Sequence, residues 1–264
     1  MIIEAKYIPK LEKLLNSDDE ANHIIAFQLM SEGGAPADLH PAMTNQISKI
    51  QLCMQYGFRD IIANRRVYLP DEFVQNTVCT ALGLPYGSPL HYQDLWSLEK
   101  LVIPEPPARN HFTFGLEDDA TNLEGLQFAT QLKELSITNH EMNEQELAIL
   151  QQLPTLEVLK LKGISRGIFR MKNIQDWTPL RNLRQLKHLA LVDCQLDNVA
   201  FLAKNMEQLE FVNLQHNQLT HLLDLIDNPA IRHCTVDVRN NPLATDELPR
   251  QIDHLKLRKV EVLV

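Results

Sequence analysis

Residues 186–196 read LKHLALVDCQL, and the same pattern returns as LEFVNLQHNQL at 209–219 and as HCTVDVRNNPL at 233–243. The shared pattern is L-x-x-L-x-L-x-x-N-x-L, with Cys194 at the Asn position of the first copy and His233 at the first position of the third. The copies begin 23 and 24 residues apart. Three consecutive matches at a nearly constant period predict an array of structural repeats, each stacked on its neighbours.

Weaker copies extend the array in both directions. They occupy residues 98–103, 132–142, 156–161 and 257–262. In the last copy the pattern places Leu257, Val260 and Val262 in the core. Two intervals are longer than the rest because they contain insertions, at about 104–125 and 162–178. One strand for each copy gives about seven strands.

Each copy contains the apolar alternation of a short strand, in which two side chains face the core and the residue between them faces outward. One such unit cannot cover its own apolar face, so neighbouring units stack and their strands join into one parallel sheet. The segments between strands carry helix signals, such as the capping box formed by Asn143 and Glu146. We therefore expect an α/β solenoid over residues 95–264.

The first 94 residues lack the repeat and have a helical pattern instead. The spacing Ser17-x-x-Glu20 predicts a capping box at the start of one helix. Further helices are expected at about 41–56 and 71–82. We expect residues 1–94 to form an all-helical domain that caps the open end of the solenoid.

A polar ladder is expected inside the solenoid, at the Asn position of each repeat. The turn after each strand buries backbone N–H and C=O groups, and an Asn side chain can both accept from them and donate to them. Asn217 and Asn241 have this role by position. Cys194 is a weaker substitute, and His140 occupies the same position in the copy at 132–142.

The stretch NIQDWTPLRNLRQLKHLALVDCQLDNVAFL at 173–202 resembles the leucine-rich repeats of the short-repeat class found in internalins and in protein-phosphatase regulatory subunits. The resemblance covers about residues 95–264. It implies a leucine-rich-repeat solenoid with its parallel strands on the concave face. Unlike secreted internalins, the chain begins with MIIEAKYIPKLEKLL, which has no signal-peptide pattern. We therefore expect a cytosolic bacterial protein of this class.

Composition and charge exclude several classes of function. The chain is 44% hydrophobic and 22% charged, as is usual for ordered soluble proteins. Its formal net charge of -9 argues against nucleic-acid binding, because contact with phosphates favours surfaces dense in lysine and arginine. No apolar segment is long enough to predict a membrane span. We expect a cytoplasmic protein that binds neither nucleic acid nor membrane.

The cysteines and histidines form no recognisable metal or catalytic motif. Cys53, Cys79, Cys194 and Cys234 are far apart and contain no C-x-x-C pair, so they indicate neither a zinc site nor a dense disulfide framework. The ten histidines include no H-E-x-x-H spacing. We therefore expect reduced, buried thiols, no metal, no cofactor and no enzymatic activity.

Binding is better supported by the geometry of the repeats than by any motif. Short parallel strands in register present columns of outward residues that a partner can contact across several repeats. The central copies place apolar side chains between polar ones, as in an interface core with a polar rim, and Phe211 is the expected anchor. The candidate partner-binding residues are Val158, Lys160, His188, Ala190, Val192, Phe211, Asn213, Gln215, Thr235, Asp237 and Arg239. The predicted function is a protein-interaction module that binds a protein or peptide on the concave strand face.

The sequence is also compatible with two other functions and with a homodimer. The chain could be a regulatory subunit or effector whose helical N-terminal region carries a separate activity, or a purely structural scaffold. The last copy, LRKVEVLV at 257–264, predicts an edge strand through which two chains could pair into a homodimer. In a monomer, Lys259 and Glu261 would point outward as charges that discourage such pairing.

Overall fold

The computed structural model describes residues 7–33, 63, 66–67, 69–106, 121–164, 174–202 and 206–264. The chain forms two compact units. One consists of Met1–Val67 with Pro89–Asp94, and the other of Tyr68–Ser88 with Leu95–Val264. The expected helix at 41–56 and most of both expected insertions lie outside the described residues.

In the described part of the first unit, helix α1 (Ile8–Leu15) packs on helix α2 (Glu20–Gly33). The buried apolar side chains of this pair are Leu11, Leu15, Ala26, Phe27 and Met30. Asp19 caps α2, because its carboxylate accepts a hydrogen bond from the N–H of Ala21 at 2.9 Å. The hydroxyl of Ser17, the cap expected from the sequence, accepts instead from the N–H of Asp19 at 3.1 Å. The helix therefore begins later than the Ser17 capping box predicts.

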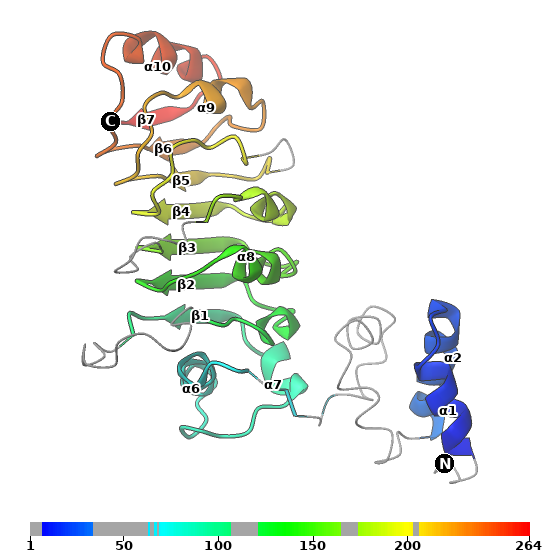
Figure 1. The fold of residues 1–264 in the computed structure, drawn as a ribbon. Helices are drawn as coiled ribbons and strands as arrows, with labels where there is room; N and C mark the ends of the chain where they lie inside the picture. Colours follow the sequence, from blue (N-terminus) through cyan, green and yellow to red (C-terminus); the bar gives the residue numbers. More distant parts are fainter. Residues whose placement is uncertain are drawn as a thin grey trace. The chain divides into compact units, whose positions relative to one another are not determined.

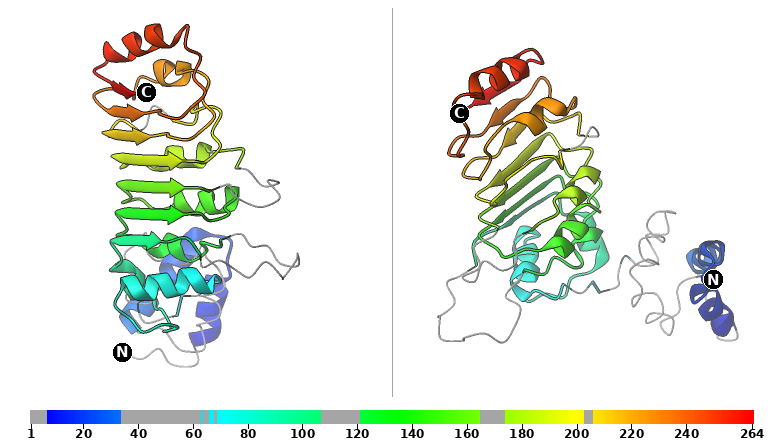
Figure 2. Two further views of the ribbon diagram at one scale, coloured as in Figure 1. Left: turned by 90° about the vertical axis from the view of Figure 1, so that its left-hand side faces the viewer. Right: turned by 45° about the horizontal axis from the view of Figure 1, so that its top comes forward.

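The second unit is built on one open sheet of seven parallel strands in sequence order (Figures 1 and 2). The strands are β1 (Lys100–Ile103), β2 (Glu134–Thr138), β3 (Val158–Lys162), β4 (His188–Val192), β5 (Phe211–Asn213), β6 (Thr235–Asp237) and β7 (Glu261–Leu263). From β1 to β6 the strands pair in the predicted register, with His188 opposite Phe211 and Phe211 opposite Thr235. The α/β leucine-rich-repeat solenoid with about seven strands is confirmed.

The alternating leucines account for the sheet. In β3 and β4, the inward side chains of Leu159, Leu161, Leu189 and Leu191 have no exposed surface. Burying one leucine side chain completely contributes about 1.5–3 kcal/mol. Because the same two positions face inward in each of these strands, the apolar core continues from one repeat to the next.

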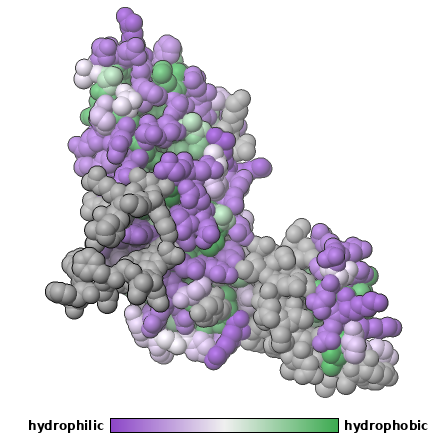
Figure 3. All heavy atoms as spheres, viewed as in Figure 1, coloured by the Kyte–Doolittle hydropathy of each residue, from purple (hydrophilic) through white to green (hydrophobic). Residues whose placement is uncertain are grey.

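The segments that return from one strand to the next carry short helices, mostly on the opposite side of the sheet from its outward residues (Figures 1 and 2). They are η3 (Leu126–Phe128), α8 (Glu144–Leu150), η4 (Thr178–Asn182), α9 (Leu223–Asp227) and α10 (Leu248–Lys256). The predicted capping box opens α8: the Asn143 side chain accepts from the N–H of Gln145 at 2.7 Å, and the Glu146 carboxylate accepts from the N–H of Asn143 at 2.9 Å. Seen from the direction of Figure 1, the visible surface of this unit is largely hydrophilic (Figure 3).

Helix α6 (Glu72–Ala81) packs beside β1 in the same unit, where the sequence predicts a helix (Figure 1). One oxygen of its cap, Asp71, accepts hydrogen bonds from the first turn of the helix at 2.9 and 3.1 Å. The other oxygen accepts from the N–H of Asn122 at 3.3 Å, which joins the helix to the segment before β2. The short helix α7 (Tyr92–Trp96) precedes β1. The domain boundary expected after residue 94 stays a prediction.

The last repeat differs from the predicted register by two residues. Thr235 lies opposite Glu261 in β7, and not opposite Lys259. Lys259 lies in the turn before the strand, with a φ of 60°. Leu257, predicted to be in the core, is 84% exposed, whereas Val260 is buried as predicted.

Helix α10 accounts for this shift. Leu255, in its last turn, is completely buried and supplies the apolar side chain that the pattern expected from Leu257. The N–H of Val260 then donates to the Leu255 carbonyl in a tight turn at 3.2 Å. A similar exchange occurs before β6, where His233 is exposed and Cys234 is buried in its place. The homodimer expected through the last strand stays a prediction.

Candidate functional site

The eleven predicted site residues lie in three adjacent columns on the face of the sheet that points away from the core, here called the outer sheet face. The first column contains Val158, His188, Phe211 and Thr235. The second contains Lys160, Ala190, Asn213 and Asp237. The third, at the ends of the strands, contains Val192, Gln215 and Arg239. The paired register therefore brings all of these residues onto one surface.

The middle of the outer sheet face is apolar. The Phe211 ring packs against the His188 imidazole, with ring centroids 6.3 Å apart and the ring planes at 43°. Val158 and Val192, on β3 and β4, are half-buried like Phe211. Such side chains retain apolar area that a partner can remove from water, at roughly 25 cal/mol for each Å².

A polar network bounds this patch on β5 and β6. The carboxylate of Asp237 accepts hydrogen bonds from the Arg239 guanidinium at 2.6 and 3.0 Å and from the amide of Gln215. Asp237 is only 2% exposed. The Arg239 guanidinium, with a smaller contribution from Gln215, holds the pKa of Asp237 below its ordinary value. The Asn213 side chain also accepts from the N–H of Gln215 at 3.0 Å, so the network keeps its side chains in one arrangement.

A second charged cluster bounds the patch on β1 to β3. The Glu134 carboxylate lies 2.8 Å from the Lys100 ammonium and 3.1 Å from the Lys160 ammonium. Hydrogen bonds from Lys100 and then Lys160 lower the pKa of Glu134. Both lysines are more than half exposed, so water and salt screen these pairs. The outer sheet face therefore has charged groups on either side of its apolar middle.

An alternating row of charges, which the sequence reasoning missed, runs along the edge where the strands begin. The residue immediately before each of the first five strands is Glu99, Lys133, Glu157, Lys187 and Glu210. Lys133 lies 3.2 Å from Glu99, and Lys187 lies 2.8 Å from Glu157. Lys187 lowers the pKa of Glu157, and Glu157 raises the pKa of Lys187. This row could have been predicted from the sequence, because the charge at this position changes sign from each repeat to the next.

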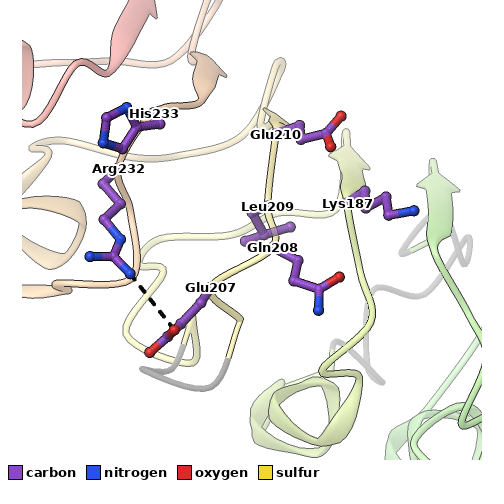
Figure 4. A pocket seen from close by; sticks show the side chains of 7 residues that line it. All are labelled: Lys187, Glu207, Gln208, Leu209, Glu210, Arg232 and His233. Atoms are coloured by element: carbon purple, nitrogen blue, oxygen red, sulfur yellow. Dashed lines mark ion pairs between the residues drawn. The ribbon is translucent and has the colours of Figure 1, made fainter.

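A shallow hollow lies at the end of this row (Figure 4). It has a volume of roughly 340 Å³ and is lined by Lys187, Glu207, Gln208, Leu209, Glu210, Arg232 and His233. The Arg232 guanidinium lies 3.7 Å from the Glu207 carboxylate (Figure 4). Charges of both signs line the hollow and compensate one another, so it offers no single preferred charge to a ligand.

The polar ladder lies beneath the ends of the strands. The Asn217 amide donates to the carbonyls of Leu191 and Leu214 at 2.7 and 2.9 Å. The Asn241 amide donates to the carbonyls of Leu214 and Val238 at 2.9 and 2.8 Å. The side chains of consecutive repeats thus meet at the same carbonyl. This arrangement satisfies buried backbone groups that would otherwise have no partner.

The ladder changes chemistry toward the N-terminal repeats. The Cys194 thiol lies 3.5 Å from the carbonyl of Leu161, and a thiol is a weaker donor than an amide. Ile164 stands at the equivalent position of the preceding repeat and is buried. His140 is buried one repeat earlier and bonds the carbonyl of Pro104 at 2.8 Å. The same structural position therefore holds amide, thiol, aliphatic and imidazole side chains.

A left-handed backbone residue precedes the ladder position in five repeats. These residues are Asn139, Gly163, Asp193, His216 and Asn240, with φ between 54° and 66°. Glycine reaches this region without strain, and Asn, Asp and His are enriched there among the other residues. The sequence alone could therefore have predicted a left-handed residue at this position, because these residue types recur there in each of the five repeats.

Three cysteines fall within the described residues, Cys79, Cys194 and Cys234, and all three are buried thiols. Burial raises the pKa of Cys194 to about 12 and that of Cys234 to about 11. Cys53 lies outside the described residues. Among the residues with a described placement, no three His, Cys, Asp or Glu side chains are grouped to hold a metal ion. None of the described helices is long and apolar enough to span a membrane.

Among curated proteins, the chain is similar to Receptor-like protein 9b from Arabidopsis thaliana, with 31% identity over 111 residues. The match covers 41% of this chain and 11% of that protein, so the chain matches about a tenth of the length of this curated relative. No protein-family model matches the chain.

Solved structures similar to the chain include a leucine-rich-repeat protein of Leptospira interrogans, with 18% identity, a TM-score of 0.47 and coverage of 65% of this chain and 38% of that chain. A secreted internalin-like protein from Listeria monocytogenes is 16% identical, with a TM-score of 0.47 and coverage of 74% and 63%. Internalin C2 from the same species is 16% identical, with a TM-score of 0.36 and coverage of 74% and 93%. These likenesses are distant. The repeated L-x-x-L-x-L pattern, the seven parallel strands in sequence order and the ladder beneath them make this chain a leucine-rich-repeat solenoid.

Proposed function

We propose that this protein is an interaction module that binds a protein or peptide along its outer sheet face. The observation that carries the proposal is the position of Phe211. Its ring is half-buried and lies against His188. The half-buried Val192 is on the neighbouring strand β4, and the half-buried Val158 is one strand farther away, on β3. An aromatic side chain that belongs to an apolar patch with polar surroundings has the chemistry of a binding hot spot.

The scaffold supports the same role because it holds the face rigid. Each strand is hydrogen-bonded to its neighbours, and the Asp237–Arg239–Gln215 network holds polar side chains in place. A surface that is ordered before binding loses less conformational entropy when a partner arrives. A sheet of short parallel strands is therefore suited to bind a long segment or a folded surface.

Affinity capture tests this function. The full chain, immobilised, is incubated with lysate of the source cells beside a double variant, Phe211→Ala with His188→Ala, and a control, Leu223→Ala. Leu223 is an exposed leucine of α9, in a return segment away from the outer sheet face. We expect the wild type and the control to retain the same proteins and the double variant to lose them.

Equal recovery by all three chains would overturn the proposal. It would favour a separate activity of the helical N-terminal region, or a structural scaffold. The proposal keeps the cytoplasmic, bacterial setting expected from the sequence, and fractionation of the source cells would test the location. It also keeps the expectation that the module acts without a cofactor.

A further inference from the structure

The charges on the outer sheet face point to the chemistry of its partner, an inference that rests on the proposed function. From β1 to β6 the outward positions carry four cationic side chains, Lys100, Lys160, Lys162 and Arg239. They carry two carboxylates, Glu134 and Asp237, and a third, Glu261, follows on β7. The whole chain has a formal net charge of -9. On the outward positions of these six strands, basic side chains therefore outnumber acidic ones by two, although the net charge of the chain is negative.

Both carboxylates on these six strands are already neutralised by the protein itself. Arg239 holds Asp237 through two hydrogen bonds of 2.6 and 3.0 Å. Glu134 lies between Lys100 and Lys160, so this cluster of two lysines and one carboxylate keeps one surplus positive charge. The surplus lies on β1 to β3, at one end of the apolar patch.

Lys162 adds a second positive charge at the same place. It is exposed and lies at the end of β3, directly opposite Val192 in the register. It makes no ion pair or side-chain hydrogen bond with any residue whose placement is described. An ammonium group beside an apolar patch loses hydration when a partner covers the patch, and a carboxylate on that partner compensates for the loss.

We propose that the outer sheet face binds an acidic segment of a partner protein, with carboxylates over Lys160 and Lys162 and an apolar side chain over Phe211. A basic segment would be repelled by the uncompensated lysines. A purely apolar segment would leave Lys162 desolvated without a partner. The acidic segment satisfies both the charge and the apolar patch, and its binding weakens as salt rises.

A library of random twelve-residue peptides displayed on phage tests this proposal against the immobilised full chain. We expect the retained peptides to be enriched in Asp and Glu beside aromatic or aliphatic residues. A synthetic copy of the most enriched peptide should bind Lys162→Glu about tenfold more weakly. The same peptide should bind the Phe211→Ala variant at least as weakly as it binds Lys162→Glu. Lys256→Glu, which reverses an exposed lysine of α10, should bind like the wild type.

The outcomes separate the two proposals. Peptides that need Phe211 but show no acidic enrichment and no effect of Lys162→Glu would overturn the acidic partner and leave the proposed function standing. Failure to recover any peptide that depends on Phe211 would overturn both. Single-stranded DNA that binds through Lys162 more tightly than the peptides would also overturn the acidic protein segment. Equal thermal unfolding of all variants shows that the differences lie in binding.

Discussion

Asn217 holds the backbone of the preceding repeat, because its side-chain oxygen accepts a hydrogen bond from the N–H of Cys194 at 3.0 Å. The same oxygen accepts from the N–H of Leu196 at 3.1 Å, and the amide donates to the carbonyl of Leu191 at 2.7 Å. These backbone groups belong to the interior of the solenoid. The stacking of the repeats therefore depends on a polar side chain within the core as well as on leucines.

Asn217→Ala should lower the free energy of unfolding by about 1–3 kcal/mol, because it leaves buried N–H and C=O groups without partners. Urea denaturation followed by circular dichroism measures the loss. Gln218→Ala, at the adjacent exposed position, is the matched control and should change stability by less than about 0.5 kcal/mol. Equal effects of the two substitutions would contradict the role of the ladder.

His140 should make stability depend on pH. Its Nε2 bonds the carbonyl of Pro104 at 2.8 Å and its Nδ1 bonds the hydroxyl of Thr121 at 2.5 Å, and a neutral ring with its proton on Nε2 satisfies both contacts. Burial lowers the pKa of His140 in the folded chain. The unfolded chain, with a histidine pKa of about 6.5, binds a proton that the folded chain does not. Stability should therefore be highest above that pH and fall as the pH drops through it toward the folded-state value.

Urea midpoints between pH 8 and pH 5 check the His140 effect. His140→Asn should flatten the dependence, since it removes the titrating group. His254→Asn, which changes an exposed histidine of α10, should leave it as in the wild type. A wild-type slope that survives in His140→Asn would show that another group is responsible.

The buried thiols should resist alkylation in the folded protein. Burial raises the pKa of Cys194 to about 12 and that of Cys234 to about 11, so almost no thiolate exists at pH 8. Iodoacetamide labelling read by peptide mass spectrometry should modify both cysteines only in denaturant. A Gln218→Cys variant supplies an exposed thiol as the positive control. Labelling of Cys194 in the folded chain at the rate of that control would contradict its burial.

The row of alternating charges at the strand edge should contribute to stability in a salt-dependent way. Glu157→Lys places three lysines side by side, with Lys133 and Lys187, and should lower the Tm at low ionic strength. Added salt should shrink the difference, since the groups are exposed. The double variant Glu157→Lys with Lys187→Glu should recover part of the loss. Scanning calorimetry at two salt concentrations measures this, and a loss that is the same at both would argue against a charge effect.

Periodicity was enough to predict the strands of this chain and their register from β1 to β6. In each L-x-L pair, the two apolar side chains determine which face of the strand points to the core. The register therefore stays the same across the two longer intervals. The last strand was shifted because Leu255, which lies in a helix, and Leu257 compete for the same core position. A pattern of leucines alone cannot decide between them.

The candidate surface was predictable as a set of positions, because the register determines which residues share a column. Its side-chain arrangement was not. The Asp237–Arg239 pair joins residues two apart in sequence. The sequence does not show that the Gln215 amide, from the segment after β5, also donates to Asp237. The edge row and the left-handed residues could have been predicted, since both repeat with the period.

The central claim is that the outer sheet face binds the partner through Phe211. Calorimetric titration of an identified partner segment into the full chain, Phe211→Ala and Leu223→Ala tests it most directly. We expect Phe211→Ala to raise the Kd at least about tenfold, or about 1.4 kcal/mol. Leu223→Ala, which truncates a side chain that is 45% exposed in α9, should leave the Kd unchanged. An unchanged Kd for Phe211→Ala in a folded chain would contradict the claim.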